Sequence, residues 1–76
     1  MKTFIKQIKS ATSKAELQAI TYEAFIAENI NGKQYGKLTK YAVCREIELG
    51  VSDIINHYPS KEVALEEAQK EFRIKY

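Results

Sequence analysis

The segment from Ser13 to Asn29 constrains the fold most, because its pattern predicts a helix with two apolar faces. At about 100° per residue, two apolar stripes lie roughly opposite each other on this helix. The first stripe comprises Leu17, Ile20, Ala24 and Ala27, and the second comprises Ala15, Ala19, Tyr22 and Ile26. Such a helix needs neighbours on both faces, supplied either by other helices of the chain or by a partner.

The length and composition predict one small domain, residues 1–76, with a modest core. The chain has 76 residues, of which 19 are Leu, Ile, Val or Phe, enough for one core but not for a deep, enzyme-sized pocket as well. No apolar run approaches the roughly 18 residues of a membrane span, and the lysine-rich N-terminus lacks the apolar stretch of a signal peptide. The single cysteine, Cys44, excludes an internal disulfide and fits a reducing compartment, so we expect a cytoplasmic protein.

Cap and turn residues mark where the helices begin and end. Ser13 and Glu16 form an S-x-x-E capping box, in which each side chain satisfies a free backbone N–H of the other residue. Asn31-Gly32 tolerates positive φ and predicts a loop over 30–37. Thr39 is then the predicted cap of a third helix.

Gly50 leaves two interpretations open. The apolar spacing of the third helix continues through it and suits one helix over 39–58, at a cost of about 1 kcal/mol for the glycine. The alternative, which we favour, is a break at Gly50 with Ser52 capping a new short helix. In both cases the helix ends before Pro59. The sequence thus predicts an all-α fold, a compact bundle of four to five short helices over about 3–11, 13–29, 39–49, 52–58 and 60–75.

Few side chains of this sequence are suited to catalysis or metal binding. Cys44 lies on a predicted core stripe, where a cysteine usually acts as a small buried hydrophobe, and the one histidine, His57, lies near a helix end. The sequence contains neither CxxC nor HxxxH, and its glycines match no phosphate-binding motif. We therefore expect no catalytic residue, no metal and no cofactor, and a non-enzymatic protein.

Basic residues are unevenly distributed, although the net charge is only +2. Residues 1–14 and 31–45 each carry four basic residues and no acidic one. The second block combines cations that attract phosphates with aromatic rings that stack on bases. It predicts a candidate nucleic-acid surface with contacts from Lys33, Tyr35, Lys37, Lys40, Tyr41 and Arg45.

The helix over 13–29 predicts a different function. If other helices cover only one of its faces, the second face becomes an interface for another protein or for a second copy of the chain. The candidate interface residues are Tyr22, Phe25 and Ile26. We therefore predict a small accessory or adaptor protein that acts through protein–protein interaction or self-association. Nucleic-acid binding is the alternative, and we expect no membrane partner.

Overall fold

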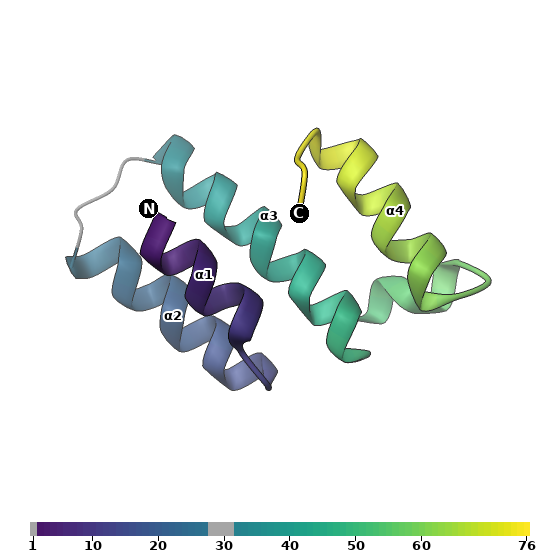
Figure 1. Cartoon of the computed structure of the whole chain (residues 1–76), viewed down its shortest axis with the longest axis horizontal. Helices are drawn as coiled ribbons and strands as arrows, with labels where there is room; N and C mark the ends of the chain where they lie inside the picture. Colours follow the sequence, from purple (N-terminus) through teal and green to yellow (C-terminus); the bar gives the residue numbers. More distant parts are fainter. Residues whose placement is uncertain (1, 28–31) are drawn as a thin grey trace.

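The computed structural model describes residues 2–27 and 32–76, and within those ranges its regular structure is entirely helical. In chain order the helices are α1 (Lys2–Ser10), α2 (Lys14–Ala27), α3 (Gly32–Leu49), the 3-10 helix η1 (Asp53–His57) and α4 (Lys61–Phe72) (Figure 1). The all-α prediction is confirmed. None of the described helices is both long enough and apolar enough to cross a membrane.

The longest of these helices, α3, lies in the centre of the molecule and separates two apolar clusters. Figure 1 shows α1 and α2 side by side on one flank of α3 and α4 on the other flank. Leu38 and Ala42 of α3 belong to the cluster shared with α1 and α2. Cys44 and Ile47 belong to the cluster shared with α4. The helix with two buried faces is therefore α3 and not α2.

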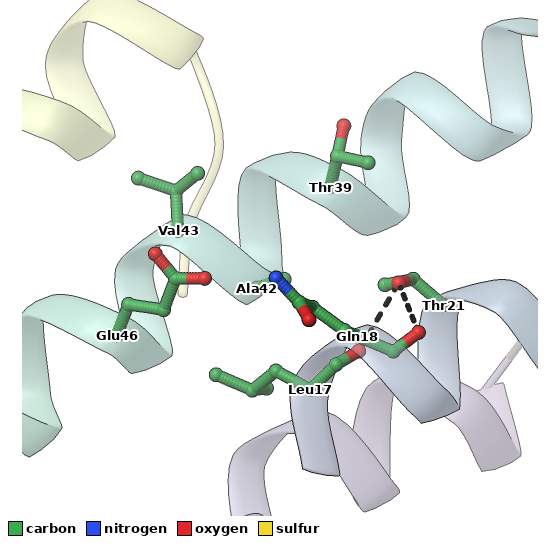
Figure 2. A pocket seen from close by; sticks show the side chains of 7 residues that line it. All are labelled: Leu17, Gln18, Thr21, Thr39, Ala42, Val43 and Glu46. Carbon is green, nitrogen blue, oxygen red and sulfur yellow. Dashed lines mark hydrogen bonds between the residues drawn. The ribbon is translucent and has the colours of Figure 1, made fainter. Parts of the chain in front are cut away.

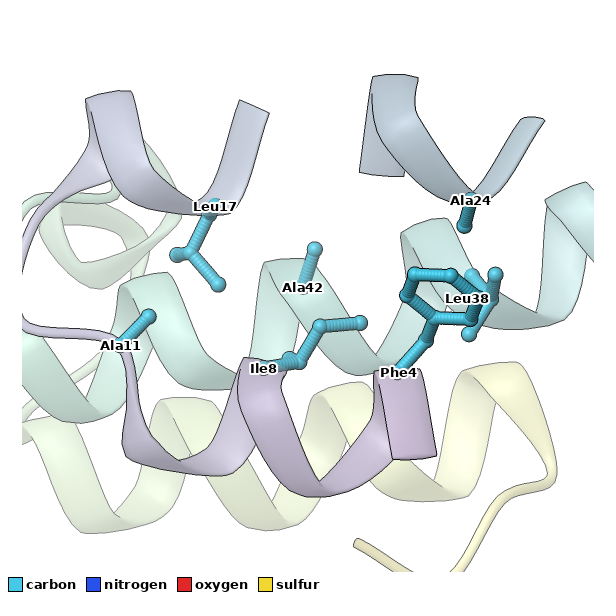
Figure 3. Close-up of a cluster of buried hydrophobic side chains, with 7 residues drawn as sticks. All are labelled: Phe4, Ile8, Ala11, Leu17, Ala24, Leu38 and Ala42. Atoms are coloured by element: carbon cyan, nitrogen blue, oxygen red, sulfur yellow. The ribbon is translucent and has the colours of Figure 1, made fainter. Parts of the chain in front are cut away.

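The first cluster fills the space between α1, α2 and α3. Figure 3 shows side chains from all three helices, with Ala11 just after α1, pointing toward one another: Phe4, Ile8, Ala11, Leu17, Ala24, Leu38 and Ala42. Leu17 and Ala24 are seven residues apart, two helical turns, so they share one face of α2. They belong to the first predicted stripe, and Ile20 of the same stripe is half-buried against this cluster. The side chain of Ala27, in the same stripe, lies outside the described part of the chain.

The second cluster packs α4 and η1 against the opposite face of α3. Its buried members are Cys44 and Ile47 of α3 with Ala64 and Ala68 of α4. The two alanines are four residues apart, so they lie on one face of α4 and let its backbone approach α3 closely. Half-buried apolar residues close the edges of this cluster: Val43, Ile54, Ile55, Tyr58, Leu65, Phe72, Ile74 and Tyr76.

The start of α3 differs from the prediction. The helix begins at Gly32, so the predicted loop over 30–37 is wrong from residue 32 onward. Thr39 is not a cap but lies inside α3, and its hydroxyl donates a hydrogen bond of 2.8 Å to the carbonyl of Gly36. Leu38 is fully buried and anchors this part of α3 in the first cluster. Its burial stabilises the helix by about 2 kcal/mol and so offsets the roughly 1 kcal/mol that each glycine costs.

Residues 28–31 lie outside the described part of the chain. The predicted end of the second helix, near Asn29, and the first residues of the predicted loop fall in this range.

The predicted break at Gly50 is confirmed. Gly50 has a φ of +77°, a left-handed conformation that ends α3 after Leu49. Ser52 then caps η1, because its side chain accepts a hydrogen bond of 3.3 Å from the N–H of Ile54. The new segment is a 3-10 helix, a form common in short connecting pieces.

One of the two hydrogen bonds of the predicted capping box is present at the start of α2. The Oγ of Ser13 accepts a hydrogen bond of 3.2 Å from the N–H of Glu16, as predicted. The carboxylate of Glu16, however, accepts from the N–H of Thr12 at 2.6 Å and from its hydroxyl at 3.0 Å. The side chain therefore reaches one residue further back than the predicted Ser13 N–H.

The last helix ends earlier than the prediction of 60–75. Ser60 caps α4 by accepting a hydrogen bond from the N–H of Val63, and the helix ends at Phe72. Arg73 adopts a left-handed conformation with φ 57° and ψ 42°, and its N–H donates to carbonyls of the last turn. The chain reverses there because Ile74 is apolar and packs against the second cluster, which a straight continuation of α4 would not allow.

Candidate interaction surfaces

The outward side of α2 carries three large apolar side chains. The exposed fractions are 66% for Tyr22, 50% for Phe25 and 59% for Ile26. These are the three predicted interface residues, and all of them lie on the surface. Ala15 and Ala19, which complete the second predicted stripe, are exposed too. We call these five residues the α2 face.

The α2 face is uncovered because both neighbours of α2 lie on its other side. α1 and α3 contact α2 through the first cluster, and α4 lies beyond α3 (Figure 1). The sequence left open whether the chain itself covers the second stripe. Within the described residues, the chain covers the first stripe and leaves the second one free.

Phe25 lies at the edge of the α2 face that is nearest to α3. Its ring packs edge-to-face against the ring of Tyr35, with centroids 5.3 Å apart and an angle of 64° between the planes. Aromatic pairs of this kind contribute about 0.5–1.5 kcal/mol beyond the area that they bury. Tyr35, predicted as a nucleic-acid contact, therefore extends the α2 face instead of joining the lysines of α3.

Three predicted nucleic-acid contacts converge on one pocket. Lys33, Lys37 and Lys40 lie at i, i+4 and i+7, which places them on one face of α3. They line a pocket of about 440 Å³ between the N-terminal half of α3 and the end of α4. Arg73 lines the same pocket, and Gly32, Gly36, Phe72 and Ile74 complete it. We call Lys33, Lys37, Lys40 and Arg73 the basic pocket.

Arg73 is the member of the basic pocket that the sequence did not identify. A helix continuing to residue 75 would place Arg73 on the surface of α4, whereas its left-handed backbone turns the chain back toward α3. The signal for this turn is Ile74, an apolar residue off the main stripe of α4 that indicates a second neighbour. Within residues 2–27 and 32–76, no cation of the basic pocket forms an ion pair.

Tyr41 and Arg45, the remaining predicted nucleic-acid contacts, lie away from the basic pocket. The ring of Tyr41 is 6.2 Å from that of Tyr76, and the ammonium of Lys9 lies 5.9 Å and 5.4 Å from these two rings. Arg45 pairs with Glu48 at 3.1 Å and also donates to a backbone carbonyl just after α1. The hydroxyl of Tyr76 donates to the Glu48 carboxylate as well. These contacts hold α1, α3 and the C-terminal segment together.

The residues suited to nucleophilic or metal chemistry do not form a site. Cys44 is fully buried, and burial raises the pKa of its thiol to about 11, so the thiol is protonated and unreactive at neutral pH. His57 is exposed on η1. Among the described residues, no group of three or more His, Cys, Asp or Glu side chains is placed to hold a metal ion.

A second, smaller pocket lies between α2 and α3. Its volume is about 180 Å³, below the range of about 300–1,000 Å³ that is usual for small-molecule sites. Figure 2 shows its lining, with the hydroxyl of Thr21 bonded at 3.1 Å to the carbonyls of both Leu17 and Gln18. Because its buried hydroxyl is already satisfied, we interpret this pocket as a packing gap.

No family model, no curated protein and no solved structure matches this chain. The α2 face and the basic pocket are therefore the features of the molecule from which a function can be inferred.

Proposed function

We propose that this chain is a small, non-enzymatic accessory or adaptor protein that binds another polypeptide through the α2 face. The observation that carries the proposal is the exposure of Tyr22, Phe25 and Ile26 on one side of a single helix. Scattered apolar residues are normal on protein surfaces, but a contiguous apolar patch with a polar rim is typical of an interface. Tyr35 enlarges the patch through its contact with Phe25.

Burial of the α2 face supplies enough free energy for specific but moderate binding. Full burial of one large apolar side chain contributes about 1.5–3 kcal/mol, and these three side chains are already one third to one half covered. Their combined contribution is therefore about 3–5 kcal/mol before the entropic cost of association. This favours a reversible partner over a permanent complex. The free, buried thiol of Cys44 supports a cytoplasmic location as part of the proposal.

Site-specific photo-crosslinking tests this function. The photoreactive residue benzoylphenylalanine is placed at Tyr22 in one variant and at Glu71, exposed on α4, in a matched control. Irradiation of cells that express each variant is expected to give a discrete cross-linked band from position 22 and none from position 71. Absence of a band from position 22, or equal bands from both positions, would contradict the proposal.

Nucleic-acid binding is the second candidate function, and the basic pocket is the observation that favours it. Four cations without ion-pair partners among the described residues gather around one pocket of about 440 Å³, although the chain has a net charge of only +2. Such a cluster attracts phosphates, and the attraction weakens as salt rises because counterions are released on binding. It ranks second because Tyr35 and Tyr41, the aromatic rings predicted to stack on bases, do not line the pocket.

Fluorescence anisotropy with labelled single- and double-stranded DNA and RNA tests this second function. If it is correct, binding at low salt weakens steeply toward physiological salt, and the triple variant Lys33→Glu, Lys37→Glu, Lys40→Glu does not bind. Arg73→Glu alone is expected to weaken binding, because Arg73 lines the same pocket. Absence of binding at low salt would remove this candidate and leave the α2 face.

A further inference from the structure

We infer that the partner of the α2 face is a second copy of this chain, bound with its α2 antiparallel about a two-fold axis. This inference rests on the proposed function of the α2 face and specifies its occupant. It is carried by the order of small and large residues along α2 and by a hollow beside the α2 face.

Four of the five residues of the α2 face are arranged symmetrically about the middle of the helix. The fifth, Phe25, lies at the edge of the face and has Glu16 as its counterpart. Ala19 and Tyr22 lie at equal distances on either side of the Ile20–Thr21 peptide bond, and Ala15 and Ile26 lie at equal, larger distances from it. The N-terminal half therefore carries the small residues and the C-terminal half the large ones. A two-fold axis through this midpoint places Ala19 opposite Tyr22 of the second copy and Ala15 opposite its Ile26.

This pairing of small with large side chains makes the α2 face complementary to itself. An interface between identical copies about a two-fold axis must use the same patch on both sides, and two helices approach most closely where each large residue meets a small one. A parallel arrangement would instead place Tyr22 against Tyr22 and Ala15 against Ala15. The helices would then be pushed apart at one end and leave a gap at the other. The sequence of α2 favours the antiparallel arrangement.

A surface hollow lies next to the small-residue half of the α2 face. Its volume is about 360 Å³, and it opens between α1 and α2 with Ala19 and Ile20 on its wall. Gln7, Ser10, Ala11 and Glu16 complete its lining. In the antiparallel pair, the ring of Tyr22 from the second copy packs against Ala19 at the edge of this hollow. The most exposed large side chain of α2 therefore packs at the edge of this hollow.

The size of the α2 face limits the strength of the pair. α2 has 14 residues and is about 21 Å long, so one helix against one helix buries less than the roughly 800 Å² per partner of a standard interface. We therefore expect a reversible dimer that forms at concentrations of about 0.1 mM and above. Binding of the α2 face to a different, larger protein would not require the symmetric order of small and large residues along α2.

Cysteine pairing in mixtures tests both the second copy and its orientation. Cys44→Ala removes the native thiol from the background, and Ala15→Cys or Ile26→Cys then introduces one thiol into each of two proteins. Equal amounts are mixed and oxidised gently, because a disulfide forms only when the Cα atoms approach within about 7 Å. A mixture of Ala15→Cys with Lys61→Cys, exposed on α4, is the collision control. Circular dichroism verifies that each variant is helical.

We expect disulfides between position 15 and position 26 to form at least fivefold faster than those of the collision control. We also expect the yield of 15–26 disulfides to be higher than the yield of 15–15 or 26–26 disulfides. Dominance of 15–15 and 26–26 pairs would overturn the antiparallel arrangement. Rates equal to the control in all mixtures would overturn the second copy as partner. The proposed function is judged separately by benzoylphenylalanine at position 22. A cross-link there to a different protein, with no 15–26 disulfide, would retain the proposed function and reject this inference.

Discussion

The rings of Phe25 and Tyr35 meet edge-to-face at 5.3 Å and join the exposed side of α2 to the first turns of α3. The two residues lie on either side of the segment 28–31, and they come from the regions that the sequence assigned to two different candidate surfaces. Their contact makes Tyr35 part of the apolar surface and leaves the lysines of α3 to form a separate site with Arg73.

A double-mutant cycle on these two rings tests the contact. Phe25→Leu and Tyr35→Leu are each expected to lower the free energy of unfolding, and the double variant to lose less than the sum of the two. The coupling is expected to be about 0.5 kcal/mol, at the low end for aromatic pairs, because both rings are partly exposed. Urea unfolding monitored by circular dichroism measures all four proteins. Additive losses would show that the rings do not interact in solution.

Two glycine substitutions that are expected to change the free energy of unfolding in opposite directions test the observed bounds of α3. Gly36→Ala is expected to raise the free energy of unfolding by about 1 kcal/mol, because Gly36 lies inside the helix and a Cβ there would meet no described atom outside the neighbouring backbone of α3 within 4 Å. Gly50→Ala is the matched comparison and is expected to lower it by about 1 kcal/mol, because φ at Gly50 is +77°. If residues 32–37 were a loop, Gly36→Ala would bring no such gain.

The Glu16 carboxylate makes the free energy of unfolding depend on pH in the acid range. The hydrogen bonds from the N–H and hydroxyl of Thr12 lower the pKa of Glu16 below its ordinary value of 4.5. A carboxylate with a lowered folded pKa stabilises the fold above the unfolded value, and this contribution is lost as pH falls through the folded value. Glu16→Gln is expected to lower the free energy of unfolding at pH 6 and to flatten its decrease between pH 5 and pH 3. Equal pH profiles for the two proteins would contradict the contact with Thr12.

The Cys44 thiol makes the free energy of unfolding depend on pH in the alkaline range. Burial raises its pKa from 9.0 to about 11. A group whose folded pKa is raised contributes its full stability below the unfolded value, and the contribution is lost as pH rises through the folded value. Between pH 8 and pH 11 we expect the wild type to lose on the order of 2 kcal/mol more than Cys44→Ala, by urea unfolding at each pH. Equal losses would show that the thiol is accessible to water.

A charge reversal at Glu23, which lies beside the seam between the two α2 helices, tests the antiparallel pairing. In that arrangement Glu23 of one copy lies on the same side of the seam as Glu16 of the other, so the wild-type pair is weakened by repulsion between carboxylates. Glu23→Lys converts two repulsive contacts into attractive ones and is expected to strengthen dimerisation about fivefold, or on the order of 1 kcal/mol. Glu71→Lys on α4 changes the net charge equally and is expected to have no effect. Equal effects of the two substitutions would indicate a response to net charge alone.

Most of the fold could be predicted from local sequence signals. Ser13, Ser52 and Ser60 each cap a helix with their own side chains, and Gly50 ends one, so these boundaries depend only on neighbouring residues. The start of α3 could not be predicted in this way. Asn31-Gly32 and Gly36 carry a local loop signal, whereas the helix there is held by Leu38, whose burial depends on α1 and α2.

The two surfaces differ in how far the sequence could identify them. The periodicity of α2 alone placed Tyr22 and Ile26 on a common side. Phe25 falls among polar residues in that pattern, and its contact with Tyr35 shows how it joins the same surface. The basic pocket needs Arg73 to line the same pocket as Lys40, and that arrangement depends on the reversal of the chain after α4 and on the packing of α4 against α3. Such a long-range arrangement leaves no periodic signal in the sequence.

Sedimentation equilibrium of the wild type and of the double variant Tyr22→Gln, Ile26→Gln tests the role of the α2 face most directly. Both positions are exposed, so the variant is expected to keep its helical circular dichroism signal. Between about 0.05 and 1 mM, the average mass of the wild type is expected to rise from 8.7 kDa toward twice that value, while the variant stays at 8.7 kDa. A wild type that remains at 8.7 kDa throughout, or a variant that associates equally well, would contradict self-association through the α2 face.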